Sequence, residues 1–594
     1  MAEQPSSSPS ATRFLTGVLE QVKEEWKVQR EEYGRRLQRT LENRVKDGFC
    51  VSGVRWERAG QNGQEIFSTA ENFSDFREGD LVILHEGDPQ APLARMVWMG
   101  DESVEHGRED IILGSTNGRT RREWPTGELI IDQGFMDLED RYVQTLQNVA
   151  SSFRGQERIL PLLMATAGED MVSQEEFTKS VREAEEAGFN ASQQEAIAEG
   201  VSAQWCALIQ GPPGTGKTRV LAEIVRQRVA RGERILLTGF THRAIHHALN
   251  VVHGVLPDTC PVVKIGQPLG DGKLSVDEYA NFKDSPLTGC EGGYVVGATP
   301  FAARSKRLAG VDFDCVVMDE ASQMPLAQAL MAMLSADIYI IIGDPKQLPP
   351  VLQSVPPGET VRYSIFAALE KNRDKALLTE TYRMNQALTE WVSNEFYLGL
   401  LQAAEKCRDR HLELSPERTS PEWMEELLKP EVSLGWVEIP HSSARTASFE
   451  EAAMVRELIL SLTQRGVDPA KIGVVTPFRR QARLIRQRLR SGGGAQAGFF
   501  REIIIDTVER MQGQEREVVI LSTAVSDPDF ISAREEFIYL PARLNVAVSR
   551  ARTKLLVFSS KVFLENTSSR DSIQEALAHW QSLRSSARTV LADG

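Results

Sequence analysis

The sequence is poor in cysteine, and its six cysteines form no C-x-x-C pair. Structural zinc sites and iron–sulfur clusters take ligands from such closely spaced pairs, so the sequence predicts neither. No apolar run is long enough to span a bilayer, and residues 1–12 are polar and rich in serine, unlike a signal peptide. We therefore expect a cytoplasmic protein whose thiols are buried or unreactive.

Positive charge is scarce overall, since the formal net charge is −15. This balance argues against indiscriminate binding to polyanions, although a nucleic-acid groove needs only local positive charge. Basic residues gather in two stretches, at 30–44 and at 479–490, and the second contains six arginines. Such a run usually forms the solvated face of a helix, and contact with a nucleic acid is the alternative.

A glycine-rich segment is the most informative part of the chain. It fits the complete pattern G-x-x-x-x-G-K-T and lies between an apolar run and apolar residues at helical spacing, so we predict a strand, a loop and a helix. Backbone N–H groups of such a loop face phosphates. The sequence thus predicts triphosphate binding by Gly211, Pro212, Pro213, Gly214, Thr215, Gly216, Lys217 and Thr218, with Lys217 reaching the β- and γ-phosphates and Thr218 ligating Mg²⁺.

Apolar periodicity predicts an α/β protein with two tandem parallel-sheet lobes and a small β-barrel. Apolar runs of strand length alternate with helical patterns in both lobes, but only the first lobe has a phosphate loop. The expected regions are a disordered N-terminus (1–13), a long helix (14–47), a β-barrel (48–115), a linker with helices (116–188), lobe 1 (189–356) and lobe 2 (357–594).

Two carboxylates, Asp319 and Glu320, follow a predicted buried strand of lobe 1. Phosphoryl transfer to water needs one acid to hold Mg²⁺ and another to orient or deprotonate the water, and we assign these roles to Asp319 and Glu320 in that order. Gln347 lies in a Gly/Pro turn after the next strand, where it can sense a γ-phosphate or its water. A helix cap and a plain turn are the alternatives.

Tyr382 beside Arg383 combines a ring that can stack on a base with a guanidinium that can clamp a phosphate. Arg550 offers another arginine near the end of lobe 2. Taken singly, each arginine is more typical of a surface salt bridge. Because lobe 2 has no phosphate loop, we expect one nucleotide site shared across the cleft, in which an arginine accelerates hydrolysis from the opposite lobe.

These motifs, in this order, resemble those of superfamily 1 helicases, specifically the Upf-like branch, whose members move 5′-to-3′ on single strands. The resemblance covers residues 189–554 and implies two RecA-like lobes, a helical stalk, an accessory barrel, ATP and Mg²⁺. It assigns Gln193 to the adenine base, Tyr382 to stacking on adenine and Glu515 to the ribose. It also places Arg383 and Arg550 at the γ-phosphate.

The same resemblance predicts nucleic-acid contacts at strand ends, where hydroxyls and amides hold phosphates without reading bases. The residues concerned are Thr241, His242, Thr299, Pro300, Thr476, Pro477, Arg479 and Thr507. We expect an ATP-dependent 5′-to-3′ helicase or translocase, a monomer that acts on single-stranded DNA or RNA with DNA slightly favoured. The alternative is an ATP-gated nucleic-acid clamp, remodeller or sensor without processive unwinding.

Overall fold

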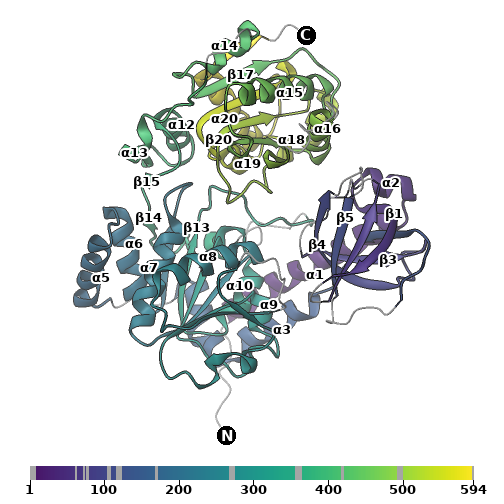
Figure 1. Cartoon of the computed structure of the whole chain (residues 1–594). Coiled ribbons are helices and arrows are strands. Elements are labelled where there is room, and N and C mark those ends of the chain that lie inside the picture. Colours follow the sequence, from purple (N-terminus) through teal and green to yellow (C-terminus); the bar gives the residue numbers. More distant parts are fainter. Residues whose placement is uncertain are drawn as a thin grey trace.

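A computed structural model of the chain describes residues 9–60, 63–70, 72, 74, 76, 79–103, 109–115, 123–166, 172–266, 274–354, 364–415, 420–490 and 500–591. Figure 1 shows two α/β lobes, one above the other, and a β-barrel beside them. Helix α1 (Pro9–Leu37) runs from behind the lower lobe to the barrel. The predicted fold class, two parallel-sheet lobes with a small barrel, is confirmed.

The N-terminal segment forms two helices, α1 and α2 (Leu41–Lys46), and not the single helix predicted over residues 14–47. The break occurs because Thr40 caps α2, its hydroxyl accepting a hydrogen bond from the Asn43 backbone N–H at 3.4 Å. Residues 1–8 of the predicted disordered N-terminus lie outside the described residues, whereas residues 9–13 are helical. The apolar side of α1 is buried through Leu15, Val18, Val22 and Trp26.

Six antiparallel strands close into a barrel in the order β1-β2-β5-β4-β3-β6. Their bounds are Cys50–Ala59 (β1), Gln64–Thr69 (β2), Leu81–His85 (β3), Ala94–Ser103 (β4), Glu109–Ser115 (β5) and Leu129–Gln133 (β6). Alternate side chains fill the interior, among them Val54, Phe67, Trp98 and Leu113. The predicted barrel end at residue 115 is wrong, because β6 closes the barrel by pairing with both β1 and β3.

A helical segment leads from the barrel back to the lower lobe. It comprises α3 (Glu139–Ser151), the π-helix η1 (Gly155–Ile159), α4 (Leu160–Leu163) and α5 (Gln174–Glu186). Arg154 anchors it, because its Nε donates to Asp337 at 2.7 Å and its Nη1 donates to the Leu334 carbonyl at 2.9 Å. Together with α1, this segment forms a stalk that carries the barrel on the lower lobe.

Lobe 1, the lower lobe, contains an eight-stranded parallel sheet in the order β10-β9-β11-β8-β12-β13-β7-β14. The strands are β7 (Cys206–Gln210), β8 (Arg234–Gly239), β9 (Val262–Ile265), β10 (Asp277–Tyr279), β11 (Tyr294–Gly297), β12 (Cys315–Asp319), β13 (Ile338–Gly343) and β14 (Ala376–Leu377). Alternate side chains enter two separate apolar clusters, Val316 and Met318 on one face and Cys315 and Val317 on the other. Its longer helices are α6 (Ala191–Ser202), α7 (Lys217–Ala230), α8 (His242–Val255) and α10 (Leu326–Met333), joined by the short helices α9 (Pro300–Ala303) and α11 (Ile365–Leu369).

The chain leaves lobe 1 later than predicted. Strand β14 pairs with β7 at Ile209 and Gln210, so the first lobe extends past the predicted boundary at residue 356. A two-residue edge strand has too little periodicity to be read from sequence, and its partner lies more than 160 residues earlier. The crossing then passes through β15 (Glu380–Thr381), which pairs with β16 (Gln402–Ala403).

Lobe 2 has a six-stranded parallel sheet in the order β19-β18-β20-β21-β17-β22. The strands are β17 (Leu434–Glu438), β18 (Ile472–Thr476), β19 (Ile504–Thr507), β20 (Arg516–Ser522), β21 (Ala551–Ser559) and β22 (Arg588–Leu591). Its helices are α12 (Gln386–Phe396), α13 (Glu405–Arg408), α14 (Glu422–Leu428), α15 (Phe449–Gln464), α16 (Arg479–Arg490), α18 (Pro528–Ile538), α19 (Pro541–Val548) and α20 (Asp571–Ser586). In both lobes a parallel sheet offers its carboxyl edge, where ligands bind in open α/β sheets.

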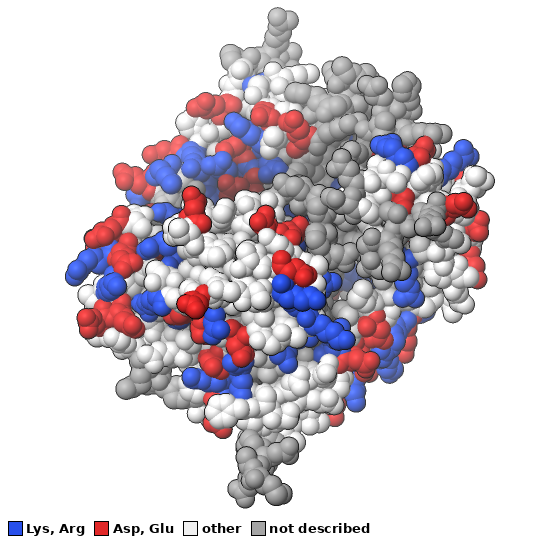
Figure 2. Space-filling model, turned by 60° about the horizontal axis from the view of Figure 1, so that its bottom comes forward, with Lys and Arg blue, Asp and Glu red and all other residues white. Residues whose placement is uncertain are grey.

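The barrel side of the molecule also touches lobe 2. Arg483 of α16 donates to the Lys46 carbonyl at 3.4 Å, and Arg510 donates to the Phe76 carbonyl at 3.4 Å. On the face drawn in Figure 2, acidic and basic side chains are interspersed and do not form a surface of one sign. Within the described ranges, no helix combines the length and the apolar character that crossing a membrane requires.

Candidate functional site

The phosphate loop follows β7 and ends where α7 begins at Lys217. Gly214 and Gly216 have φ values of +74° and +79°, a left-handed conformation that favours glycine. A Cβ on Gly211 would lie 2.1 Å from Lys217 Cγ, and one on Gly214 would lie 2.5 Å from Arg383 Cβ. The loop therefore requires glycine for close packing as well as for its backbone, and it directs the N-terminus of α7 toward the cleft.

Polar contacts hold this loop in shape. Lys217 Nζ donates to the Gly211 carbonyl at 2.7 Å, and Thr215 Oγ1 donates to the Pro212 carbonyl at 2.8 Å. Gln193 is buried, and its Nε2 donates to the Thr215 carbonyl at 2.9 Å while its Oε1 accepts from the Asn190 N–H at 3.2 Å. The structure thus brings Gln193 against the loop, where its amide supports the loop backbone.

The acidic pair lies at the carboxyl end of β12. Asp319 is buried, and its Oδ1 accepts a hydrogen bond from the Glu320 backbone N–H at 2.9 Å. Burial raises the pKa of Asp319 to about 7, and the adjacent Glu320 carboxylate adds to this effect while Lys217 opposes it. Glu320 has a φ of +51°, a strained conformation for a residue with a side chain. The buried Asp319 carboxylate beside the half-buried Glu320 carboxylate favours a cation next to the pair.

The Gly343 turn follows β13 and holds Gln347 in a buried position. Gln347 Nε2 donates to Asp344 Oδ2 at 2.8 Å, and Gln210 Nε2 donates to Asp344 Oδ1 at 3.3 Å. Asp344 was not among the predicted site residues, although it stands beside Gly343 in the same turn. Its carboxylate orients Gln347 and joins the ends of β7 and β13.

The crossing segment contacts the phosphate loop directly. Tyr382 N–H donates to the Gly214 carbonyl, and Thr381 Oγ1 donates to the Pro213 carbonyl, both at 2.8 Å. The Tyr382 hydroxyl accepts from Asn190 Nδ2 at 2.8 Å, so the predicted stacking ring stands beside the segment that carries Gln193. Lys406 Nζ lies 4.8 Å from the centre of the Tyr382 ring. The structure therefore gathers Gln193, Tyr382 and the loop, although they are far apart in sequence.

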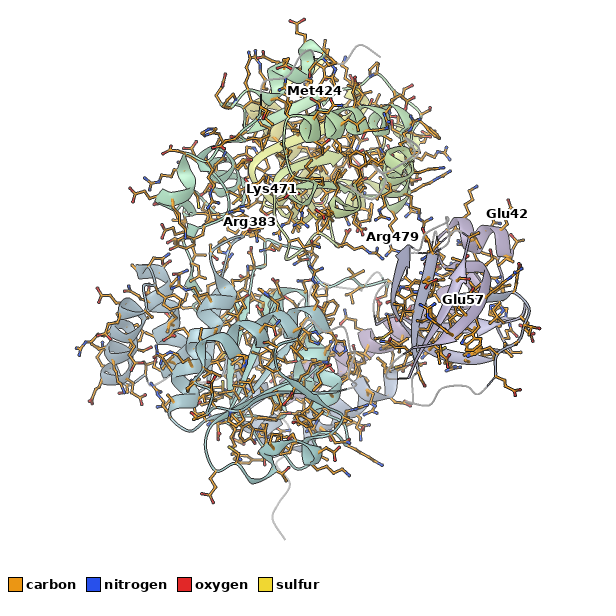
Figure 3. The ribbon with its side chains drawn as sticks, viewed as in Figure 1. Glu42, Glu57, Arg383, Met424, Lys471 and Arg479 are labelled. Carbon is orange, nitrogen blue, oxygen red and sulfur yellow. The ribbon has the colours of Figure 1, made fainter. Side chains whose placement is uncertain are left out.

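Lobe 2 contributes two arginines and a carboxylate. Arg383, labelled between the lobes in Figure 3, donates from Nε to Glu515 at 2.6 Å and from Nη1 to the Ser549 carbonyl at 3.0 Å. Arg550 is 2% exposed and donates to the carbonyls of Val546 at 3.1 Å and Gln514 at 3.2 Å. Burial and the nearby charge of Arg383 lower the pKa of Arg550 to about 9, whereas Glu320 of lobe 1 acts in the opposite direction.

Comparison with known proteins agrees with this arrangement. Two family models, each described as an AAA domain, match residues 193–353 and 361–562, which together hold every residue of the nucleotide site. The "DNA replication ATP-dependent helicase/nuclease dna2" of Schizosaccharomyces pombe is 28% identical over 403 residues, covering 63% of this chain and 28% of that protein. The "DNA polymerase alpha-associated DNA helicase A" of the same yeast is 29% identical over 433 residues, covering 62% of this chain and 63% of the relative.

A third relative is the "Regulator of nonsense transcripts 1 homolog" of Drosophila melanogaster, 29% identical over 391 residues, covering 59% of this chain and 32% of its own length. The chain belongs to the Upf-like branch of the superfamily 1 helicases. It spans less than two thirds of the length of each of these relatives. A solved structure, that of Arterivirus nonstructural protein 10 (helicase), covers 88% of this chain and 80% of its own at 13% identity, with a TM-score of 0.36.

In this Upf-like chain, the predicted nucleic-acid residues all lie at strand ends or helix starts. Thr241 caps α8, accepting from the Ala244 N–H at 3.1 Å, and Thr299 caps α9, which begins at Pro300, accepting from the Ala302 N–H at 3.2 Å. Thr476 and Thr507 end β18 and β19, and they are 0% and 4% exposed. Their side chains are therefore not open to a strand, and the buried Pro477 has no N–H, so phosphate contact at these two ends would have to come from other backbone N–H groups.

His242 and Arg479 differ in charge. Burial, with smaller effects from Lys264 and His246, lowers the pKa of His242 to about 4, so its ring is neutral near pH 7 and offers no positive charge to a phosphate. Its Nδ1 is buried without a hydrogen-bond partner among the described residues. Figure 3 shows Arg479 on the side of lobe 2 that faces the barrel. Between the two residues, only Arg479 has the charge expected of a phosphate contact.

Two further residues at the cleft had no role in the sequence-based assignment. Tyr397 caps the C-terminal end of α12, and Asn545 lies in α19, five residues before Arg550. Both are buried and both bond to the Gly343 turn of lobe 1. Nothing in the sequence around Tyr397 distinguishes it from an ordinary apolar helix end.

Proposed function

We propose that the protein is an ATP-dependent helicase or translocase that moves 5′-to-3′ on single-stranded nucleic acid. The observation that carries the proposal is the meeting of two incomplete half-sites. Lobe 1 supplies the phosphate loop, Asp319, Glu320 and Gln347, and lobe 2 supplies Arg383 and Arg550 across the cleft. With ATP bound between the two half-sites, hydrolysis of the γ-phosphate would depend on closure of the two lobes.

The nucleotide would be held mainly by backbone. Backbone N–H groups of residues 211 and 214–218, at the start of α7, would face the phosphates, with Lys217 beside them. Tyr382 and Gln193 would flank the base, and Glu515 lies where lobe 2 meets Arg383. Asp319 and the Thr218 hydroxyl are oxygen donors of the kind Mg²⁺ prefers, and the buried acidic pair fits a cation. Mg²⁺ held there would neutralise charge on the β- and γ-phosphates.

Hydrolysis then needs a positioned water and charge stabilisation. Glu320 is placed by its strained backbone at the end of β12, beside Asp319, where it would orient or deprotonate the water. Gln347 is oriented by Asp344 toward the same strand edge. Arg383 and Arg550 would stabilise the charge that develops on the transferred phosphoryl group. To do so, Arg550 would leave its bonds to the carbonyls of Val546 and Gln514, which both lie in lobe 2.

The nucleic-acid strand would cross the carboxyl edges of both sheets on the barrel side of the cleft. Thr241, Thr299 and the backbone at residues 476–477 and 507 lie at these edges, and Arg479 adds positive charge. Such contacts hold phosphates without reading bases, as movement along a strand requires. We favour DNA slightly over RNA, since two of the three relatives described above carry DNA in their names and one is a regulator of nonsense transcripts.

Two measurements test this function. ATP hydrolysis should rise when matched single-stranded DNA or RNA oligomers are added at one stated salt concentration, more with DNA. Strand displacement should occur on a 5′-tailed duplex and not on a 3′-tailed one. Stimulated hydrolysis without displacement on either duplex would replace the helicase by a nucleic-acid clamp, and the absence of any stimulation would contradict both.

A further inference from the structure

A buried hydrogen-bond chain crosses the cleft at a place distinct from the phosphate loop. Tyr397 Oη donates to Asp344 Oδ2 at 2.7 Å and accepts from Asn545 Nδ2 at 2.9 Å. Asp344 Oδ2 also accepts from Gln347 Nε2 at 2.8 Å, and the second Nδ2 hydrogen of Asn545 goes to the Lys346 carbonyl at 2.8 Å. One phenolic hydroxyl therefore links the γ-phosphate side of lobe 1 to helix α19 of lobe 2.

The four side chains along this hydrogen-bond chain are removed from water. Asp344 and Asn545 are 0% exposed, Gln347 is 3% exposed and Tyr397 is 4% exposed. Burial and the adjacent Asp344 carboxylate raise the pKa of Tyr397 well above its ordinary value, so its hydroxyl stays a donor. A hydrogen bond to a carboxylate in such surroundings is strong, and leaving its partner unpaired is costly. This hydrogen-bond chain therefore couples the positions of the two lobes tightly.

The hydrogen-bond chain ends in lobe 2 at α19, the helix next to Arg550. Asn545 is in α19, and Arg550 Nε donates to the carbonyl of Val546, the residue after Asn545. Arg550 is also close enough to Tyr397 for its charge to lower the pKa of that hydroxyl, against the larger effect of burial. A shift of the Gly343 turn is thus transmitted through one ring to the segment that holds the arginine.

We propose that Tyr397 is a positioning residue that transmits the state of the Gly343 turn, with Gln347, to α19 and so to Arg550. The inference rests on the proposed function, because it assigns Tyr397 to the coupling step of that ATPase site. Tyr397 does not touch the reacting atoms. Tyr397 sets the distance between Gln347, which senses the γ-phosphate, and Arg550, which responds.

Tyr397→Phe tests this coupling because it removes only the hydroxyl and keeps the ring in its apolar cluster. We expect kcat for nucleic-acid-stimulated ATP hydrolysis to fall about 10- to 100-fold, as for one lost bond to a buried charged group. The KM for ATP should stay within about threefold, since no contact with the nucleotide is lost. The ratio of stimulated to unstimulated rate should fall at least about tenfold.

Tyr539→Phe is the matched control. Tyr539 lies in the same apolar cluster, is 0% exposed, and its hydroxyl donates to the Phe563 carbonyl at 2.6 Å within lobe 2. The Tyr539→Phe variant loses a buried hydroxyl of the same kind, but this hydroxyl does not contact lobe 1. The kcat of this variant should therefore stay within about twofold of wild type. Where nucleic acid stimulates the wild type, equal losses in both variants, or an unchanged stimulation ratio in Tyr397→Phe, overturn the inference.

A second readout separates this inference from the proposed function. In the wild type, a non-hydrolysable ATP analogue should change amide hydrogen exchange in α19, and this change should vanish in Tyr397→Phe and in Asn545→Ala but persist in Tyr539→Phe. If α19 exchange does not respond in the wild type, or responds equally in all variants, the coupling is wrong. If α19 responds as expected but nucleic acid does not stimulate hydrolysis, the proposed function fails and the coupling stands.

Discussion

The two lobes share one sheet architecture, yet their carboxyl edges are built for opposite purposes. In lobe 1 the edge ends in a glycine loop, an acidic pair and a helix N-terminus that face outward. In lobe 2 the corresponding interior is filled by Glu451, which is 0% exposed and accepts from the Ala524 N–H at 2.9 Å, from Ser522 Oγ at 2.5 Å and from His441. In lobe 1 the strand ends carry the nucleotide loop, whereas in lobe 2 the end of β20 is filled by the lobe's own side chains.

The difference shows how one fold gives two roles. In the proposed function, lobe 2 lends Arg383, Glu515 and Arg550 to the neighbouring site instead of forming a site of its own. The buried network of Glu451 joins the ends of its central strands, and the hydrogen bonds of Tyr397 and Asn545 connect lobe 2 to the Gly343 turn. The functional unit is therefore the cleft, and neither lobe alone contains it.

The largest effect on ATP hydrolysis is expected from substitutions at the nucleotide site of lobe 1. Lys217→Ala and Glu320→Gln should each lower nucleic-acid-stimulated ATP hydrolysis by about 10³-fold or more, to the level of an assay without enzyme, because each removes a group needed at the transferred phosphate. Lys179→Ala, which changes a lysine of stalk helix α5 with a 73% exposed side chain, is the control and should keep wild-type turnover. Turnover near wild type in Lys217→Ala or Glu320→Gln, with contaminating ATPases removed, would sink the assignment.

In lobe 2, we expect the loss of the buried Glu451 carboxylate to lower the free energy of unfolding, in addition to any effect on ATP hydrolysis. Glu451→Ala leaves the Ala524 N–H, Ser522 and His441 without their buried acceptor, which should cost about 3 kcal/mol or more of the free energy of unfolding. Urea unfolding measures this loss. The neighbouring and exposed Glu450 is the control, and Glu450→Ala should change stability by about 0.5 kcal/mol or less. Equal stability of the two variants would show that the network does not hold lobe 2 together.

The smallest effect concerns the pH dependence of stability that arises from His242, one of the lobe 1 residues predicted to contact nucleic acid. The folded pKa of His242, about 4, lies below its ordinary value of 6.5 because of burial, aided by Lys264 and His246 and opposed by Glu278. Its contribution to stability is therefore complete above about pH 6.5 and is lost as the pH falls toward 4, by up to about 3 kcal/mol. His242→Asn should flatten the stability profile between these pH values, whereas His247→Asn, on the exposed side of α8, should not. Parallel profiles for wild type and His242→Asn would contradict the burial argument.

Sequence patterns predicted the lobes and the nucleotide loop well, because each depends on residues close together in the chain. Residues 211–218 carry their own strand, turn and helix signals, and β12 ends at Asp319 as its apolar run indicates. Strands β6 and β14 were assigned to the wrong regions, since a barrel closure and a sheet edge depend on partners far away in the chain.

The finer details of the site depended on packing. Thr476 and Thr507 were expected to offer hydroxyls to a strand, but burial leaves only their backbone for that purpose. His242 was expected to contact nucleic acid, and its surroundings keep it neutral near pH 7. Tyr397 gave no sequence signal at all, because its role depends on Asp344 and Asn545, which are 53 residues before it and 148 residues after it. Pairings across a cleft cannot be read from local periodicity.

The most direct test of a site shared between the lobes is single-turnover hydrolysis of bound ATP by Arg550→Ala, in the presence of single-stranded nucleic acid. We predict ATP binding within about threefold of wild type and hydrolysis slower by about 10²-fold or more, because lobe 1 holds the nucleotide and lobe 2 supplies charge in the transition state. Arg584→Ala, which changes an arginine of α20 that pairs with Glu438 within lobe 2 and has a 41% exposed side chain, should hydrolyse ATP at the wild-type rate. Unchanged hydrolysis in Arg550→Ala would contradict the account, because lobe 1 would then be a complete site by itself.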